Sequence, residues 1–148
     1  MPEFLIAVNA GQEPKPLSKV ASGGELSRVM LAIKSVVADD DEIDTLIFDE
    51  IDTGISGRAA QKVGVKIKQL SRAGKQVICV THLAQIAAMA NLHFLIEKHE
   101  GDQSTSTDVS ELDFEGKKRE LARIIGGVKI TELTLKNAEE MLEMADDL

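Results

Sequence analysis

The sequence predicts an α/β fold with a largely parallel sheet, flanking helices and an edge hairpin. Two compact apolar runs, Thr45 to Phe48 and Gln76 to Val80, are typical of buried strands. Between them, apolar residues recur at helical spacing, at Ala60, Val63, Ile67 and Leu70. Because a strand, helix, strand unit normally pairs its strands in parallel through a right-handed crossover, both strands are expected to end at the same edge of the sheet.

Before this unit the chain is expected to hold a short strand, a loop and an amphipathic helix. Residues 4–9 are typical of a strand, and the proline-containing stretch 11–16 is typical of a loop. The helix is predicted from Glu25 to near Asp39, and the acidic residues 39–42 are expected to form a solvated loop. One apolar face of this helix is expected to be buried: Leu26, Val29, Met30, Ile33 and Val37.

After the unit, the edge hairpin is predicted from two strands at 93–98 and 105–112, joined by a polar turn at 100–103. A short helix over 83–89 is expected before the hairpin. Two further helices are expected near residues 115–125 and 131–144, separated by consecutive glycines.

Composition limits the kind of protein this can be. The 148 residues, 43% hydrophobic and 28% charged, predict one folded domain over 1–148, and no apolar run is long enough to span a membrane. A net charge of −8 excludes the basic surface of an autonomous DNA-binding domain, so any DNA contact must be local. A single Cys79 excludes intramolecular disulfides, and no secretory signal is present, which predicts a cytoplasmic protein.

The segment Ser22-Gly23-Gly24-Glu25 opens the predicted helix and has two interpretations. The first is a capping box, with Ser22 as the N-cap and Glu25 reaching back to its amide. That leaves two consecutive glycines unexplained, because each costs about 0.5–1 kcal/mol relative to alanine in a helix. The second interpretation is an anion site, in which bare amides and the Ser22 hydroxyl would hold a phosphate.

Polar residues follow both predicted strands. Asp49 and Glu50 end the first, and His82 follows the second, so all three are expected at one edge of the sheet. Asp49 could hold Mg²⁺ through water, and Glu50 could face an attacking water. The alternative is a solvated loop with a structural histidine. Cys79 and His82 should point to opposite faces of one strand, which argues against a shared metal.

Basic residues cluster on two predicted helices, where a solvated face is the ordinary interpretation and a phosphate-backbone patch the alternative. They are Arg58, Lys62, Lys66, Lys68, Arg72 and Lys75 on the first and Lys117, Lys118, Arg119 and Arg123 on the second.

Three segments, in order and spacing, resemble the signature motif, the Walker B strand with its D-loop, and the switch histidine of ABC-type ATPases. They are residues 20–28, residues 46–57 and Val80-Thr81-His82. The residues of these motifs are most similar to those of the SMC-like ATPases that repair DNA double-strand breaks in bacteria. The resemblance extends from about Phe4 to the last helix. It implies the C-terminal lobe of an ABC/SMC-type P-loop ATPase head.

The resemblance also implies roles for single residues. Asp49 would be the Mg²⁺-associated acid, Glu50 the base that polarises the lytic water, and His82 the γ-phosphate sensor. The residues that would contact ATP held by a partner head are Ser22, Gly23, Gly24 and Glu25. The D-loop that crosses the dimer interface would be Gly54, Ile55, Ser56 and Gly57.

Two departures from the family pattern matter. Transporter subunits usually carry Pro-Thr-Ser after the Walker B glutamate and an Asp in the D-loop, where this chain has Ile51-Asp52-Thr53 and Ser56. The phosphate-cradling pattern G-x-x-x-x-G-K-[ST] is absent, because Gly74-Lys75 and Gly116-Lys117 lack both the upstream glycine and the following Ser or Thr. The Walker A half and the coiled coil of such a head are therefore expected outside this chain.

The expected function is an ATP-binding and hydrolysis half-site, with ATP and Mg²⁺ as cofactors and little activity from this chain alone. The expected partners are the missing N-terminal Walker A half, a second head in a homodimer, and DNA through the full-length protein near the nucleoid. One alternative is a fragment of a transporter's nucleotide-binding subunit, which residues 51–57 disfavour. Another is a non-catalytic dimerisation module, which Glu50 and His82 disfavour.

Overall fold

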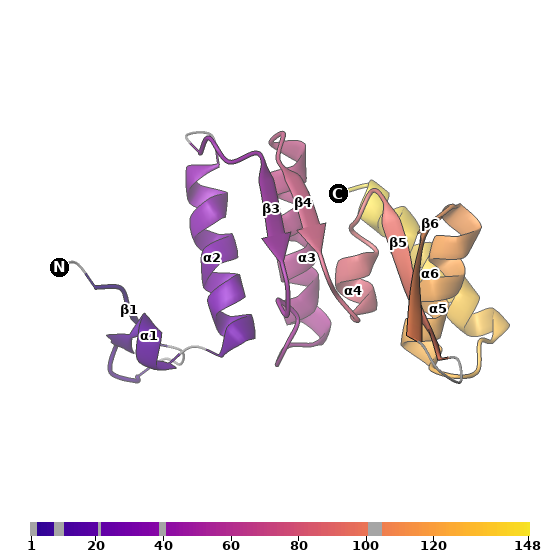
Figure 1. The fold of residues 1–148 in the computed structure, drawn as a ribbon, viewed down its shortest axis with the longest axis horizontal. Coiled ribbons are helices and arrows are strands. Elements are labelled where there is room, and N and C mark those ends of the chain that lie inside the picture. The colour runs from indigo at the N-terminus through magenta and orange to yellow at the C-terminus, as the bar shows by residue number, and fades with distance from the viewer. Residues whose placement is uncertain (1–2, 8–10, 21, 39–40, 101–104) are drawn as a thin grey trace.

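The computed structural model describes residues 3–7, 11–20, 22–38, 41–100 and 105–148. Its centre is a pair of parallel strands, β3 (Thr45–Phe48) and β4 (Gln76–Cys79), whose residues pair one to one along their whole length. The helix α3 (Gly57–Arg72) connects them and covers one face, as Figure 1 shows. The predicted strand, helix, strand unit and its parallel pairing are confirmed.

The N-terminal part is close to the prediction but differs in detail. Strands β1 (Leu5–Ile6) and β2 (Lys15–Pro16) pair antiparallel, so the predicted loop over 11–16 contains a short strand. Residues 8 and 9 of the predicted strand lie outside the described residues. The one-turn helix α1 (Leu17–Val20) follows, and then α2 (Gly23–Val37). Residues 39 and 40 of the acidic loop also lie outside the described part.

The buried side of α2 is not the predicted apolar face. Gly24 and Leu31 are buried, whereas Leu26 and Met30 of the predicted face are 43% and 40% exposed. The helix instead turns its glycine side towards the loop after β3, where a close approach is needed. Periodicity identifies an apolar stripe on a helix, but neighbouring elements decide which stripe is covered. That expectation was wrong for this reason.

The face of the parallel pair opposite α3 is also apolar and open. Leu46 and Phe48 are buried in one cluster with side chains of α3, but Ile47 and Val80 are 70% and 54% exposed. Among the described residues, the parallel sheet has only these two strands. The prediction of a largely parallel sheet is therefore realised only in part.

The hairpin is present but not at the edge of the parallel sheet. Strands β5 (His93–Glu100) and β6 (Thr105–Leu112) pair antiparallel, and within the described residues they form a sheet of their own. The short helix α4 (Ala84–Ala87) lies between β4 and the hairpin (Figure 1), so neither hairpin strand pairs with β4. Residues 101–103 of the predicted turn lie outside the described part.

Two helices complete the chain and divide the buried side chains into two clusters. Helices α5 (Phe114–Gly126) and α6 (Glu132–Asp146) agree with the predicted pair. They pack with α4 around one apolar cluster: Ala84, Ala88, Met89, Leu121, Ala122, Ala138, Leu142 and Ala145. The other cluster joins α2, the parallel strands and α3: Leu31, Leu46, Phe48, Ile51, Ala60, Leu70 and Ile86. Ile86 of α4 extends into this second cluster, so α4 connects the two.

The basic residues of α3 are not all solvated. Lys68 is buried and donates a hydrogen bond to the carbonyl of Ala145 near the end of α6. That contact satisfies a helix C-terminal carbonyl and ties α3 to α6. Because it is buried, Lys68 is excluded from any phosphate-binding patch on the surface.

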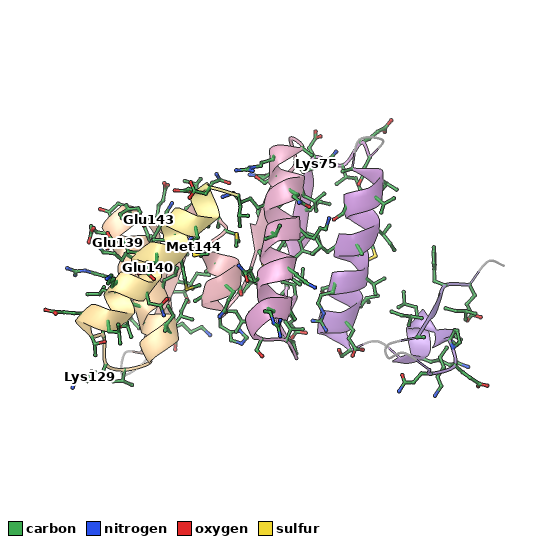
Figure 2. The ribbon with its side chains drawn as sticks, turned by 180° about the vertical axis from the view of Figure 1, so that it is seen from behind. Lys75, Lys129, Glu139, Glu140, Glu143 and Met144 are labelled. Atoms are coloured by element: carbon green, nitrogen blue, oxygen red, sulfur yellow. The ribbon has the colours of Figure 1, made fainter. Side chains whose placement is uncertain are left out.

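The outer side of α6 is acidic, and Figure 2 shows Glu139, Glu140 and Glu143 along it.

We expect the stability of the fold to depend on pH through His93. This side chain is buried, its Nε2 atom has no hydrogen-bond partner, and burial and then Lys117 lower the pKa of His93 below its usual 6.5. The unfolded chain therefore takes up a proton more readily, so the free energy of unfolding should fall as the pH drops below about 6.5. Through this group the free energy of unfolding can change by no more than about 1.4 kcal/mol per pH unit, because only one proton is taken up.

Urea unfolding at several pH values between 7.5 and 5.5 measures this dependence. His93→Asn should flatten it, while His99→Gln, which changes an exposed histidine on the same strand, should not. An equal pH dependence in the His93→Asn protein would contradict the assignment.

Candidate functional site

Asp49 and Glu50 follow β3 at its carboxyl end, and both are exposed. Glu50 has a φ of 56°, in the left-handed region that a residue with a side chain rarely adopts. Such a conformation costs on the order of 1–3 kcal/mol and is concentrated at functional sites. Hydrogen bonds hold it in place, because the Glu50 amide donates to Asp49 Oδ1 at 2.9 Å and the Thr53 amide donates to the Glu50 carbonyl at 3.0 Å.

The start of α2 is the predicted capping box. The Glu25 amide donates to Ser22 Oγ at 3.3 Å, and the Ser22 amide donates to Glu25 Oε2 at 3.2 Å. The hydroxyl of Ser22 thus serves as an acceptor inside the chain and keeps its own proton available for another acceptor.

The two glycines of α2 face the loop of residues 50–53. A Cβ atom on Gly24 would lie 2.8 Å from the Glu50 carbonyl oxygen and 2.9 Å from the Thr53 carbonyl oxygen. A Cβ atom on Gly23 would lie 2.7 Å from Oε2 of Glu50. The two consecutive glycines that suggested an anion site are therefore explained, at least in part, by the close approach of the chain's own loop. The Glu50 carboxylate lies at the positive end of the helix.

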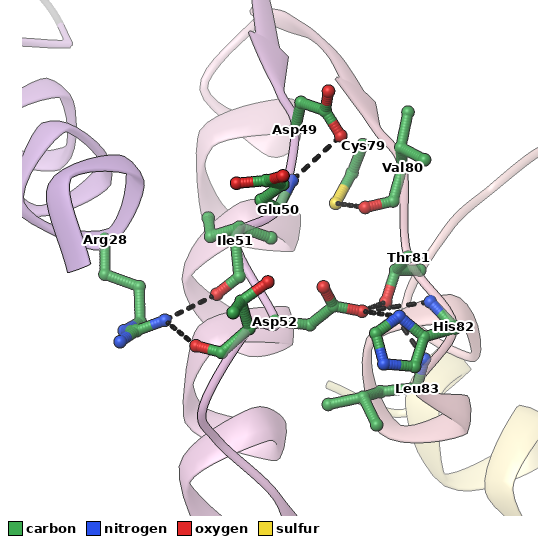
Figure 3. Close-up of polar contacts among 11 residues, drawn as sticks. Arg28, Asp49, Glu50, Ile51, Asp52, Cys79, Val80, Thr81, His82 and Leu83 are labelled. Carbon is green, nitrogen blue, oxygen red and sulfur yellow. Dashed lines mark hydrogen bonds and ion pairs between the residues drawn. The ribbon is translucent and has the colours of Figure 1, made fainter. Parts of the chain in front are cut away.

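Two side chains of α2, Arg28 (Figure 3) and Ser27, fasten that loop further. Arg28 Nη1 donates to the carbonyls of Ile51 and Thr53 at 3.0 and 2.8 Å, and Ser27 Oγ donates to the Asp49 carbonyl at 3.0 Å. These contacts leave the Glu50 carboxylate itself free. They join the helix that starts with the signature-like motif to the loop that carries the two acids.

On the other side of the loop, Asp52 faces His82. Asp52 Oδ2 accepts hydrogen bonds from Thr81 Oγ1 at 2.7 Å and from the His82 amide at 2.9 Å, and it lies 3.1 Å from His82 Nδ1. Burial raises the pKa of Asp52, but the hydrogen bonds from Thr81 and the His82 amide outweigh it, so the pKa lies below its usual 3.8. Asp52 is therefore a buried carboxylate that is charged at neutral pH.

The segment of residues 54–57 leads from this loop into α3. Gly54 and Gly57 have positive φ values of 78° and 49°, which only glycine adopts without strain. Ser56 is the N-cap of α3, but its side chain makes no capping hydrogen bond. The segment lies beside the loop that carries Glu50 and is stabilised by the Ile55 amide, which donates to the Asp52 carbonyl at 3.3 Å.

Cys79, on β4, is poorly suited to chemistry. Burial, followed by the nearby charges of Asp52 and Asp49, raises the pKa of the Cys79 thiol to about 11. Because the thiolate is the nucleophilic and metal-binding form, this thiol is almost wholly protonated at neutral pH.

The structure brings some of the predicted residues together and separates others. Glu50 turns towards Gly23 on the α2 side, whereas His82 faces Asp52 on the other side of the loop (Figure 3). Sequence reasoning missed the roles of Arg28 and Asp52. No local pattern marked Asp52 as a buried carboxylate, and nothing in the sequence indicated its partners.

The residues present are compatible with Mg²⁺ bound together with a nucleotide. Mg²⁺ is usually held by one or two carboxylates, water and phosphate oxygens rather than by a cage of protein ligands. Asp49 supplies an exposed carboxylate at the strand end, and the described residues contain no cluster of three or more metal-ligating side chains. Asp49 could thus hold the ion only with ligands from a nucleotide and water.

Among the described helices, none is both long and apolar enough to cross a lipid bilayer.

Comparison with solved structures defines the class of protein. A solved chain, described by the ATP-driven dimerization and DNA-stimulated activation of SMC ATPases, aligns with a TM-score of 0.53 and 25% identity. The alignment covers 78% of this chain and 68% of that one. The fold is that of an SMC-type ATPase head. No protein-family model matches the chain.

Comparison with curated proteins gives the particular relative. The chain is 51% identical, over 99% of its length, to DNA repair protein RecN of Bacillus subtilis. It is 49% and 47% identical to RecN of Haemophilus influenzae and of Treponema pallidum, in each case over 95% of this chain. The chain is therefore homologous to RecN, and it spans about a quarter of the length of these relatives.

Proposed function

We propose that this chain supplies part of an ATP-binding and hydrolysis site in a RecN-like DNA repair protein, with ATP held between two heads. The observation that carries the proposal is the strained Glu50. It is an exposed carboxylate held at a φ of 56° directly after a buried strand, beside the glycine start of α2. Strain of this kind is maintained only where the surrounding structure enforces it, and it favours a functional role.

The proposed roles follow from where each group lies. Glu50 polarises the lytic water, and Asp49 would hold Mg²⁺, which when bound neutralises charge on the phosphates. His82 presents an exposed ring at the same strand edge. The Ser22 hydroxyl and the first amides of α2, which lack acceptors within the helix, would donate to the γ-phosphate of ATP held by a second head. Residues 54–57 would lie at the interface between the heads.

The remaining parts of the site are proposed to come from outside this sequence. The phosphate-cradling loop is absent here, so a Walker A segment must supply it. The SMC ATPase with this fold is described as dimerizing with ATP and as activated by DNA. We infer that a homodimer forms around ATP here as well, and that DNA is bound through the longer protein.

A non-catalytic dimerisation module is the second candidate. The observation that favours it is that the Glu50 carboxylate faces Gly23 rather than His82 in this structure. In that case ATP would hold two heads together without being hydrolysed.

Dimerisation through the start of α2 can be tested with Ser22→Arg in a head completed by a RecN Walker A segment. The arginine places bulk where a γ-phosphate must approach, so the Mg-ATP-dependent dimer should weaken at least about tenfold, about 1.4 kcal/mol. Sedimentation velocity with and without Mg-ATP measures this. Ala32→Arg, which puts the same side chain at an exposed position farther along α2, should dimerise normally. An unchanged dimer in the Ser22→Arg head would contradict the proposed interface.

A further inference from the structure

We propose that Asp52 is a positioning residue for His82: it holds the imidazole with Nδ1 protonated and turned inward, and so presents Nε2 at the strand edge. The inference rests on the proposed function only in its last step, where Nε2 meets a phosphate.

The first observation is that Asp52 is a buried carboxylate to which, among the described residues, no lysine or arginine is paired. Its side chain is 2% exposed. One oxygen, Oδ2, accepts hydrogen bonds from the Thr81 hydroxyl and the His82 amide, and the edge of the His82 ring that carries Nδ1 lies beside it. Burying a carboxylate is costly unless its acceptor capacity is filled. The two hydrogen bonds fill part of that capacity and fix the position of Oδ2.

The second observation concerns the ring. The His82 side chain is 77% exposed, so packing does little to set its orientation. Within the described residues, Asp52 is the polar group recorded against it, at 3.1 Å from Nδ1. A charged carboxylate oxygen can only accept, so an Nδ1 atom that carries a proton is favoured there and an Nδ1 lone pair is repelled.

The consequence is a defined tautomer. With the proton on Nδ1, Nε2 on the opposite side of the neutral ring bears the lone pair, and a second proton taken up at Nε2 would make it a donor towards an anion. Asp52 lies within the loop that carries Glu50, and Arg28 fastens that loop to α2. The position of the His82 ring is thereby linked to the loop of the proposed catalytic acid.

The test is NMR of the ¹⁵N-labelled chain at a pH where the imidazoles are neutral. The ring ¹⁵N shifts of His82, assigned by comparison with His82→Gln, should show mainly the Nδ1–H tautomer. Asp52→Asn keeps an acceptor oxygen for Thr81 and the His82 amide but removes the charge, so His82 should shift towards the Nε2–H tautomer that an unconstrained histidine side chain favours.

Two variants separate positioning from a structural effect. Asp108→Asn removes the charge from a similar pair, in which His99 Nε2 lies 3.3 Å from Asp108 Oδ2, and should leave the His82 signals unchanged. Thr81→Val removes a hydrogen bond to Asp52 but keeps the carboxylate, so the Nδ1–H tautomer should persist. The proposal is overturned if His82 keeps its tautomer in Asp52→Asn, or if Asp108→Asn alters it equally.

The rate of ATP hydrolysis provides a second, independent test. In a completed head, Asp52→Asn should lower kcat about 10–100-fold, as the loss of a carboxylate that orients a metal-bound histidine does, with little change in KM for ATP. If the tautomer shifts but kcat does not, the positioning by Asp52 stands and the proposed role of His82 in hydrolysis fails.

Discussion

Glu50→Gln in a completed head is expected to slow ATP hydrolysis about 10²–10⁴-fold, which is about 2.7–5.4 kcal/mol in the activation free energy. The amide keeps the size of the side chain but cannot accept a proton from the lytic water. ATP binding should survive, because the Walker A segment that is proposed to cradle the phosphates, the Ser22 hydroxyl and the first amides of α2 are all unchanged. ATP should then persist between the heads, so the variant should accumulate as an ATP-bound dimer.

Phosphate release and sedimentation on the same preparation measure both effects. Glu42→Gln, at an exposed acid in the loop before β3, is the matched control and should hydrolyse ATP normally. If Glu50→Gln turns over at the normal rate, Glu50 is not the base, and the non-catalytic interpretation of the Asp49–Glu50 pair is favoured.

Gly24→Ala is expected to destabilise the fold by about 1–3 kcal/mol. The direction is opposite to helix propensity, which favours alanine over glycine by about 1 kcal/mol in a helix. The new methyl group would lie 2.8 and 2.9 Å from two backbone carbonyl oxygens, of Glu50 and Thr53. Backbone atoms cannot turn aside as the end of a side chain can. The helix and the loop must therefore separate, which also strains the hydrogen bonds made by Arg28.

Gly23→Ala is the matched control, because it makes the same substitution one residue earlier in the same helix turn. Its methyl group would meet only the movable end of the Glu50 side chain, Oε2 at 2.7 Å and Cδ at 3.9 Å. Its stability should be unchanged or slightly raised. Urea unfolding of the two variants compares them, and equal stability of both would show that the loop does not pack on α2 as described.

The local elements of this protein are readable from its sequence. The apolar runs 45–48 and 76–79 are strands, the spacing between them is a helix, and Ser22 with Glu25 forms the capping box. Each of these depends on neighbours within a few positions of the chain, through hydrogen bonds or side-chain periodicity. The parallel pairing of the two strands also followed, because the crossover connection allows little else.

The contacts between distant segments needed the tertiary structure. The side of α2 that is covered, the separation of the hairpin from the parallel strands, and the contacts of Asp52 with Thr81 and His82 all depend on how segments far apart in the chain pack together. The sequence determined where carboxylates, glycines and a histidine follow strands and begin a helix. Packing decided which of these residues meet. Neighbouring elements determine which side of a helix is covered and which side chain a buried carboxylate faces. No local sequence pattern encodes the backbone positions of those elements.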